Sequence, residues 1–300
     1  MTTGKREPDG QAIIVTGASS QIGRFLLPRL AARGYQVHAI SRHPPARPVG
    51  AKASITWHQL DINDRAASIA IPAIALIHLA PLVTLPPLIA PLARLGVKQI
   101  IAFGSTSRFS KVNSKSRHEQ ELVKGFIDAE QALAEQSERL GIGWTLFRPT
   151  LIYGCGLDKN ISTIARFIRR FGFFPMVGHG IGLRQPVHAE DLAQASLTAL
   201  ERHTSRNKAY NLSGGRTLTY QAMVETIFQA LGKKPRVMHL PLAVLQAFLA
   251  CLRLLPGYGY ITPAMAGRIN EDLCFDHQEA TRDLDFKPRP FDRDQVSAPR

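Results

Sequence analysis

The sequence predicts an α/β protein with a doubly wound parallel sheet and a smaller C-terminal lobe. Three observations lead to this fold class. Short apolar runs alternate with amphipathic segments through the first half, the first run ends at a glycine, and glycine and proline become frequent after Tyr153. Parallel strands need crossover connections, which are usually helices, so the alternation favours a parallel sheet with helices on both faces.

Six apolar runs in the first half have the length of buried strands. A helix is expected after the first run, from about residue 22 to 33, because that segment is amphipathic and stops at Gly34. A long polar helix is expected before the sixth run, over residues 117–140, with Glu130, Glu135 and Glu138 on its solvent-facing side. The six runs are residues 12–16, 35–40, 54–58, 74–80, 97–103 and 143–147.

The second half predicts fewer regular elements. Its glycines and prolines indicate loops around one basic helix near residues 163–171. Two more helices are expected at residues 189–202 and 220–231, with a strand at 209–212 between them. The proline-rich stretch at 81–91 is expected to form a rim beside the sheet, because proline restricts the backbone.

Composition restricts the class of protein. A chain of 300 residues that is 45% hydrophobic and 20% charged can bury a core without disulfides. Its three cysteines lack metal-ligand spacing, which indicates a reducing compartment and no metal site. The N-terminus lacks a signal-peptide pattern and the longest apolar run, residues 242–255, is too short to span a bilayer. We therefore expect a cytoplasmic protein.

The formal net charge of +14 leaves three explanations open. It suits anionic ligands such as dinucleotides, a negatively charged membrane surface, or a generally basic proteome. No nucleic-acid-binding motif is recognisable, so nucleic acid is not an expected partner. Residues 241–255 are apolar on nearly every helical face, which indicates either burial in the C-terminal lobe or peripheral contact with a membrane.

The turn after the first run reads TGASSQIG at residues 16–23. In a Rossmann turn the first glycine makes the tight turn and the last lets the helix pack closely on the strand, and Gly17 and Gly23 fit these roles. Ser20 or Gln21 stands where a middle glycine is common, and a serine can still offer a hydroxyl and an N–H group to a phosphate. The alternative is a strand–turn–helix unit without a ligand.

The second run ends in Ser41 and Arg42, and no acidic residue occurs between Gly34 and Asp61. An acidic residue after the second strand usually holds the ribose hydroxyl of NAD, whereas an arginine accommodates the 2′-phosphate of NADP. The sequence therefore favours NADP, with NAD as the alternative. Arg42 as an ordinary solvated loop residue is the competing explanation.

Further motifs occur in a fixed order between residues 12 and 290. They are TGASSQIG, DIND at 61–64, IHLA at 77–80, FGSTS at 103–107, RPTLIYG at 148–154, VHAEDLAQA at 187–195 and YNLSGG at 210–215. In this order and spacing they resemble the short-chain dehydrogenase/reductase superfamily, in particular its extended branch of NAD-dependent epimerases and dehydratases.

The resemblance implies a division of the chain and a set of site residues. Residues 1–153 would form the NAD(P)-binding Rossmann domain, with 187–215 returning to it, and 154–186 and 216–290 would form the substrate lobe before a polar tail at 291–300. Arg184 would hold a substrate diphosphate, with Ser105 and Ser107 also facing the substrate. The expected dinucleotide contacts are Gly17, Ser20, Gln21, Ile22, Gly23, Ser41, Arg42, Asp61, Ile62, Leu79, Ala80, Pro149 and Leu151.

The family's catalytic tyrosine is missing from this chain. The family uses a Ser/Thr hydroxyl with a Tyr and a Lys spaced YxxxK, and Thr106 matches the hydroxyl. No tyrosine occurs between Tyr35 and Tyr153. One alignment of the long helix puts Gln120 and Lys124 at the pair, so that Lys124 is a candidate electrostatic helper. The other puts Leu122 and Phe126 there. None of these side chains can act as the tyrosine does.

Two functions therefore remain open. In the first, the chain is an atypical oxidoreductase of the epimerase, dehydratase or reductase type. It would act on a nucleotide-sugar or a related phosphorylated or lipid-linked substrate, with a substitute acid or base such as Glu121 or His118. In the second, it is a non-catalytic NADP(H)-binding sensor or accessory protein, like the accessory subunit of respiratory complex I. The resemblance is also consistent with a homodimer.

Overall fold

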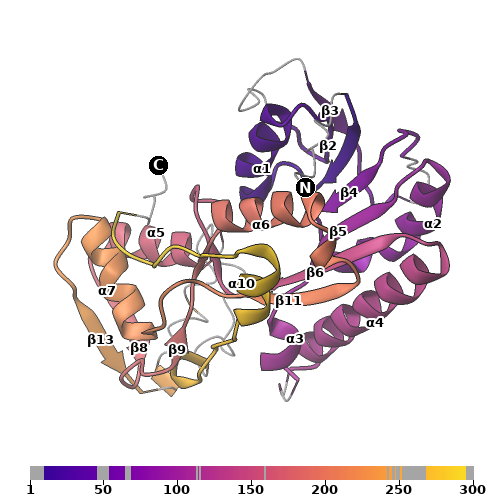
Figure 1. Ribbon diagram of the computed structural model, residues 1–300. Helices are drawn as coiled ribbons and strands as arrows, with labels where there is room; N and C mark the ends of the chain where they lie inside the picture. The colour runs from indigo at the N-terminus through magenta and orange to yellow at the C-terminus, as the bar shows by residue number, and fades with distance from the viewer. Residues whose placement is uncertain are drawn as a thin grey trace. The chain divides into compact units, whose positions relative to one another are not determined.

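The computed structural model describes residues 10–45, 54–64, 69–112, 114, 116–158, 160–241, 243–244, 247, 251 and 268–294. These residues divide into two compact units. The first unit comprises Met1–Pro149, Ala189–Leu212 and His277–Lys287. The second comprises Thr150–His188, Ser213–Asp276 and Pro288–Arg300. Figure 1 shows the elements of each unit along the chain.

The first unit is built on a seven-stranded parallel sheet with the order β11-β6-β5-β4-β1-β2-β3. The chain runs outward from β1 to one edge and then crosses back to build the other half, so the predicted doubly wound fold is confirmed. The strands are β1 (Ala12–Thr16), β2 (Gln36–Ser41), β3 (Ile55–Gln59), β4 (Ala75–His78), β5 (Gln99–Phe103), β6 (Gly143–Pro149) and β11 (Lys208–Leu212).

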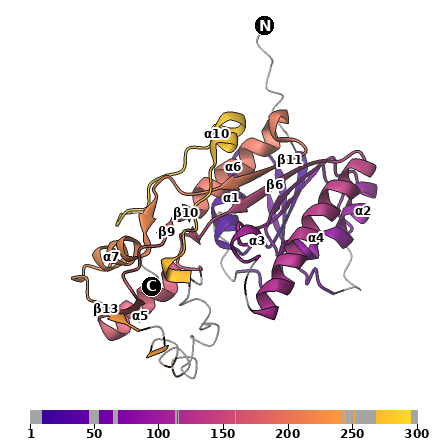
Figure 2. The same cartoon turned by 90° about the horizontal axis from the view of Figure 1, so that it is seen from below.

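Helices cover both faces of this sheet, as Figure 2 shows. Helices α1 (Gln21–Ala32) and α6 (Ala189–Glu201) pack together on one face, where Arg29 pairs with Glu190 and Arg33 with Glu201. Helices α2 (Pro86–Arg94) and α4 (Arg117–Arg139) cover the other. That face holds a continuous core, which includes Ile14, Leu76, Ile100, Leu146, Ile89 and Leu133.

The proline-rich stretch at 81–91 is largely helical rather than only a rim. It forms a single 3-10 turn, η1 (Leu82–Thr84), followed by α2. Pro86 and Pro87 occupy the first turn of α2, where a missing N–H group leaves no hydrogen bond unmade. Ile89 and Leu92 then pack into the core, and this burial accounts for a helix that the proline content did not predict.

The edge strand β11 is held by a short helix from the end of the chain. Helix α10 (Gln278–Leu284) places Asp283 where its carboxylate accepts hydrogen bonds from Lys208 Nζ and Tyr210 Oη, each at 2.8 Å. These bonds, led by the one from Lys208, lower the pKa of Asp283 to about 2. Residues 277–287 therefore lie in the first unit, whereas the expected substrate lobe extended over 216–290.

The second unit consists of short strand pairs and two main helices around a separate core. The buried side chains include Tyr153, Ile164, Ile168, Met223 and Phe228. Its elements are α5 (Ile161–Phe171), α7 (Tyr220–Ala230), η3 (Arg268–Asn270) and the paired strands β7 (Ile152–Tyr153) with β10 (Val187–His188), β9 (Leu183–Arg184) with β12 (Leu218–Thr219), and β8 (Phe174–Val177) with β13 (Val237–Leu240).

Phe291 departs from the expected polar tail at 291–300. Its side chain is completely buried, and its ring meets the Tyr153 ring edge to face with 4.9 Å between centroids. A buried aromatic ring of this size adds apolar contact that a frayed terminus would not make. The tail prediction is therefore wrong at this residue, and residues 295–300 lie outside the described part of the chain.

Most of the apolar segment 241–255 lies outside the described residues. Those described within it include Ala243, Val244, Ala247 and Cys251, which are helical and exposed. In the described part of the chain, no helix combines the length and the apolar character that crossing a bilayer requires.

Candidate functional site

The turn between β1 and α1 is shaped by a glycine that no other residue can replace without strain. Gly17 has a φ of +65°, and a Cβ built on it would lie 2.6 Å from the nitrogen of Ala80 and 2.7 Å from the carbonyl carbon of Leu79. Leu79 N in turn donates to the carbonyl of Thr16 at 2.9 Å. The turn therefore passes directly over the end of β4, as the first glycine of a dinucleotide loop must.

Helix α1 begins at the N-cap residue Ser20, whose hydroxyl accepts a hydrogen bond from Gly23 N at 3.2 Å. A Cβ on Gly23 would overlap the carbonyl oxygen of Ala18, so close packing needs glycine here as well. The first turn of α1 carries no acidic residue, which leaves the positive end of the helix dipole available to an anion. Ile22 is buried in the turn that follows.

Gln21 gives an independent sign of a missing polar partner. Its Oε1 atom is buried and has no hydrogen-bond partner among the described residues. Buried polar atoms are nearly always hydrogen-bonded, so this atom fits a site that a polar ligand completes. The glycine turn and this side chain therefore fit a dinucleotide.

The end of β2 combines a buried serine with an exposed arginine. Ser41 is buried, and its hydroxyl shares a hydrogen bond of 2.8 Å with Ser19 and accepts another from His43 N. Arg42 follows at the carboxyl end of the strand and is exposed to solvent. Such an arginine presents a cation where the ribose of a bound dinucleotide would lie.

Asp61 follows β3 and is exposed beside the same strand end. Its Oδ1 accepts hydrogen bonds from the backbone and side-chain nitrogens of Asn63, at 3.0 and 2.9 Å. These bonds lower the pKa of Asp61, and the positive charges of Arg42 and His43 lower it further. Ile62 beside it is half-buried, as are Leu79 and Ala80 after β4.

Thr106 is not placed as a free hydroxyl. Its side chain is buried, and Oγ1 donates to the carbonyl of Pro149 at 3.2 Å. The neighbouring Ser105 accepts a hydrogen bond from the backbone nitrogen of Ser107, which begins the short helix α3 (Ser107–Ser110). The carbonyl oxygen of Pro149 is thus hydrogen-bonded to the Thr106 hydroxyl.

The two possible alignments of α4 with the YxxxK pair select residues that differ in their exposure. Lys124 and Gln120 are exposed on the outer face of the helix, whereas Leu122 and Phe126 are half-buried. Phe126 packs against the main core. Lys124 is therefore turned to solvent, and Leu122 and Phe126 hold no titratable group.

Sequence reasoning missed a charged cluster one turn further along α4. Glu130 is buried and accepts hydrogen bonds from Arg108 and from Arg148, whose Nη2 lies 2.6 Å from Oε2. Both guanidinium groups also lie over the Phe109 ring, at 5.1 and 5.5 Å from its centroid. The sequence predicted Glu130 on the solvent-facing side of this helix, and that prediction is wrong because the carboxylate is buried between two arginines.

Arg184 lies in the second unit and points into its interior. It is 5% exposed, and its guanidinium donates to the carbonyls of Leu183, Glu271 and Arg268 at 2.8, 2.6 and 2.5 Å. It also lies over the Tyr220 ring. Burial lowers its pKa. The guanidinium thus joins chain segments that are distant in sequence, and much of its donor capacity is used there.

Leu151 is half-buried in the second unit, where its carbonyl accepts a hydrogen bond from Val187 N at 2.9 Å. Among the described residues, no group of three His, Cys, Asp or Glu side chains could hold a metal ion. The remaining candidates divide between the units, with the glycine turn, Arg42, Asp61 and Thr106 all in the first.

Comparison with known proteins agrees with the architecture. The model of a family described as "NAD dependent epimerase/dehydratase family" matches residues 13–88 and 87–213. Among solved structures, UDP-glucuronic acid 4-epimerase from Bacillus cereus in complex with NAD has a TM-score of 0.74 at 14% identity, covering 96% of this chain and 95% of that one. The epimerase Mth375 from Methanothermobacter thermautotrophicus has a TM-score of 0.72 at 16% identity, covering 96% and 90%.

Two curated relatives share higher identity over shorter stretches. A mitochondrial protein of Arabidopsis thaliana, NADH dehydrogenase [ubiquinone] 1 alpha subcomplex subunit 9, is 30% identical over 107 residues, which are 35% of this chain and 26% of that protein. Short-chain dehydrogenase/reductase family 42E member 1 of Mus musculus is 27% identical over 163 residues, 50% of this chain and 41% of that protein. The match thus spans about a quarter to two-fifths of these relatives.

The family model covers well over half of the chain, including the glycine turn and the strands of the seven-stranded sheet. The chain therefore belongs to the NAD dependent epimerase/dehydratase family.

Proposed function

We propose that this chain binds NADP(H) in its first unit and holds it without the family's Tyr–Lys redox chemistry. The glycine turn is the observation that supports dinucleotide binding. A Cβ atom on Gly17 or on Gly23 would clash with the neighbouring backbone and prevent this turn from forming. The partnerless Oε1 of Gln21 supports a polar ligand at the same place. Ser20, Ile22, Leu79 and Ala80 would complete the cradle.

The choice of NADP rests on the end of β2. Arg42 is exposed there, and no acidic residue that could accept from a ribose hydroxyl occurs between Gly34 and Asp61. A guanidinium can bind a phosphate through two hydrogen bonds, whereas it offers a neutral ribose no acceptor. We assign Asp61 and Ile62 to the adenine side and Pro149 and Leu151 to the nicotinamide side.

The proposal that the chain lacks the Tyr–Lys redox chemistry rests on the Thr106 hydroxyl and on the side chains of α4. Thr106 donates to a backbone carbonyl, Lys124 faces solvent, and the other alignment of α4 places Leu122 and Phe126 at the Tyr and Lys positions. A proton relay needs a titratable group within hydrogen-bond reach of the reacting atom. A bound dinucleotide would then serve assembly or redox sensing. This role agrees with the similarity to a protein named as a subunit of NADH dehydrogenase.

The absence of redox catalysis is tested by a search for turnover of the bound nicotinamide. The purified full chain is incubated with NADP⁺ or NAD⁺ and UDP-glucose or UDP-glucuronic acid. Absorbance of the reduced nicotinamide and chromatography of the sugar nucleotides are followed. We expect bound dinucleotide whose redox state stays constant and sugar nucleotides that stay unchanged. A new sugar nucleotide formed at a rate proportional to protein concentration would contradict the proposal.

An oxidoreductase acting on a nucleotide-sugar is the second candidate. Family membership favours it, together with structural likeness to a UDP-glucose 4-epimerase from Thermotoga maritima (TM-score 0.66, 18% identity, covering 93% of this chain and 94% of that one). In this case Thr106 orients the reacting oxygen, with Ser105 and Ser107 beside the substrate. If turnover is found, Thr106→Val must reduce it; undiminished turnover would remove Thr106 from the mechanism.

A further inference from the structure

The second unit carries an unusually one-sided distribution of charge. No Asp or Glu occurs between Asp158 and Glu190, nor between Glu225 and Glu271. Helix α5 lies in the first stretch and carries three arginines without an acidic residue, and three more cations precede β13 in the second. The basic residues of the two stretches are Lys159, Arg166, Arg169, Arg170, Arg184, Lys233, Lys234, Arg236, Arg253 and Arg268.

Several of these cations gather where α5 ends. Lys233 Nζ donates to the carbonyls of Ile168 and Arg169 at 3.2 and 3.1 Å, so it caps the C-terminal turn of α5. The backbone of Arg236 accepts a hydrogen bond from Phe174 N at 2.9 Å, which places it at the start of β8. Strands β8 and β13 then run side by side next to α7 (Figure 1).

Exposed apolar side chains lie among these cations. Phe171 is 39% exposed, its ring packs near Phe173, and the Arg170 guanidinium lies 5.4 Å from its centroid. Met238 on β13 is 47% exposed, and Val244, shortly after that strand, is 51% exposed. We call the set Arg170, Phe171, Phe173, Lys234, Arg236 and Met238 the basic–apolar patch.

We propose that the basic–apolar patch docks the protein onto an anionic phospholipid bilayer. Cations attract the negative head groups, and exposed aromatic and aliphatic side chains enter the head-group region, a combination typical of proteins that lie on a membrane. Residues 237–252, which begin with β13, contain no Asp, Glu, Lys or Arg. The exposed Met238 and Val244 have no flat ring on which a base could stack, and they favour a bilayer over a nucleic acid.

The experiment measures binding of the full chain to vesicles by co-sedimentation. One set of vesicles contains phosphatidylcholine with phosphatidylglycerol, and the other phosphatidylcholine alone. Each basic residue near a bilayer contributes a factor of about five, so Arg170→Gln/Arg236→Gln is expected to weaken binding to the anionic vesicles about thirty-fold. Raising the ionic strength must weaken the binding of the unsubstituted chain, because salt screens the attraction.

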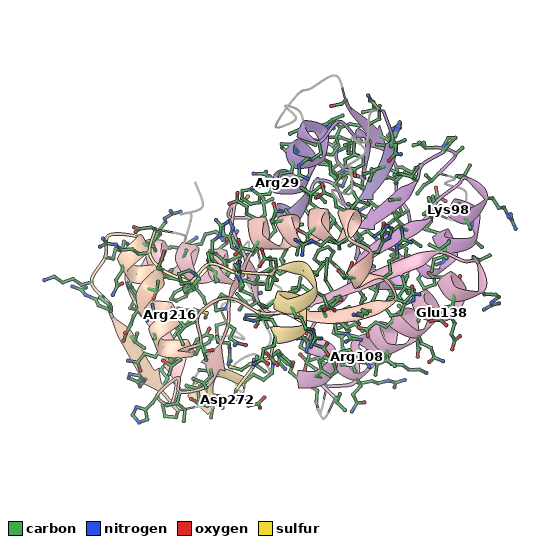
Figure 3. All side chains as sticks on the ribbon, viewed as in Figure 1. Arg29, Lys98, Arg108, Glu138, Arg216 and Asp272 are labelled. Carbon is green, nitrogen blue, oxygen red and sulfur yellow. The ribbon has the colours of Figure 1, made fainter. Side chains whose placement is uncertain are left out.

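Two control variants separate charge from folding. Lys98→Gln/Arg139→Gln removes the same charge from exposed positions of the first unit and should bind like the unsubstituted chain. Figure 3 labels Lys98. Arg170→Lys/Arg236→Lys keeps the charge on the patch and should retain binding. Thermal unfolding of each variant is measured in parallel.

Three results would overturn the proposal. The first is equal binding of the unsubstituted chain to both kinds of vesicle, and the second is unweakened binding of Arg170→Gln/Arg236→Gln. The third is binding to a stem-loop RNA probe without binding to anionic vesicles, which would assign the patch to nucleic acid instead.

Discussion

Two separate features of the structure disfavour a side chain at position 17. Its φ of +65° disfavours any residue with a Cβ, and the backbone of Leu79 and Ala80 leaves no volume for one. At Gly141 only the backbone conformation disfavours a side chain, because its φ is +67° and a Cβ there would meet nothing within 4 Å. The pair therefore separates the cost of backbone conformation from the cost of contact.

We expect Gly17→Ala to destabilise the fold by more than Gly141→Ala does. The backbone conformation costs about 1 kcal/mol in each variant, and the clash adds a further cost only at residue 17. Urea unfolding measures both, and NADPH fluorescence measures binding. Gly17→Ala should also lose dinucleotide binding while Gly141→Ala keeps it. Equal destabilisation by the two variants would show that the turn does not press on β4.

His78 is a buried histidine that stays neutral in the folded protein. It is fully buried, its Nδ1 lies 2.8 Å from Thr16 Oγ1, and its Nε2 lies 3.3 Å from the carbonyl of Pro81. Burial lowers its pKa to about 4 from the usual 6.5. Because the unfolded chain binds a proton that the folded chain does not, this histidine stabilises the fold above about pH 6.5 and loses that effect as the pH falls toward 4.

Lowering the pH from 6.5 to 4 should therefore cost on the order of 3 kcal/mol of stability through His78 alone. Urea unfolding at a series of pH values tests this. In His78→Gln the slope of stability against pH should become much shallower in that window. His203→Gln, which changes an exposed histidine, should keep the original slope. An unchanged slope in His78→Gln would contradict the assignment.

At the scale of elements, a buried carboxylate of α4 adds ion pairs to the apolar packing of this helix on the sheet. Glu130 lies between Arg108 of α3 and Arg148 of β6, so three elements meet at this residue. Figure 3 labels Arg108 and also Glu138, which lies two turns further along α4 on its exposed face. Breaking a buried ion pair leaves its partners with uncompensated charge, whereas an exposed carboxylate contributes little.

Glu130→Gln should accordingly destabilise the fold by about 2 kcal/mol or more, and Glu138→Gln by less than about 0.5 kcal/mol. Chemical unfolding at neutral pH compares the two, since each replaces one carboxylate of the same helix by an amide. Similar small effects from both would mean that the two arginines are solvated rather than held by Glu130.

The elements show what the sequence could and could not predict. Period and length identified every strand of the large sheet, because buried parallel strands read as short apolar runs. Helix α2 was missed because three prolines outweighed the apolar spacing of Ile89 and Leu92, which tertiary packing decides. Glu130 was not recognised as a structural anchor, since its partners Arg108 and Arg148 are set by the fold and not by spacing along the chain.

The same limit applies to the site residues. The glycine turn was readable because a local backbone conformation requires those residues. Thr106 matched a motif, yet only the fold reveals that its hydroxyl donates to Pro149. Arg184 likewise matched a motif, and its bonds to the carbonyls of Glu271 and Arg268 come from a segment more than eighty residues away.

At the scale of the whole molecule, ligand binding should raise stability. A ligand that binds only the folded state stabilises it by about 2.7 kcal/mol at a concentration of 100 times its Kd. NADPH should therefore raise the unfolding midpoint of the protein, and the increase should be smaller for Arg42→Ala at the same free concentration. Differential scanning fluorimetry measures the shift. An equal shift in Arg42→Ala would place the dinucleotide away from the end of β2.

The most direct test of the account is calorimetric titration of the purified chain with NADPH, NADP⁺, NADH and NAD⁺. It is repeated on Arg42→Ala and on Lys98→Ala, which removes an exposed cation ahead of β5. We predict that the chain binds NADP(H) selectively. Arg42→Ala should weaken this binding at least tenfold, because it removes a charge-assisted hydrogen bond, and Lys98→Ala should leave the binding unchanged. Failure of all four dinucleotides to bind would contradict the central claim that the glycine turn holds a cofactor.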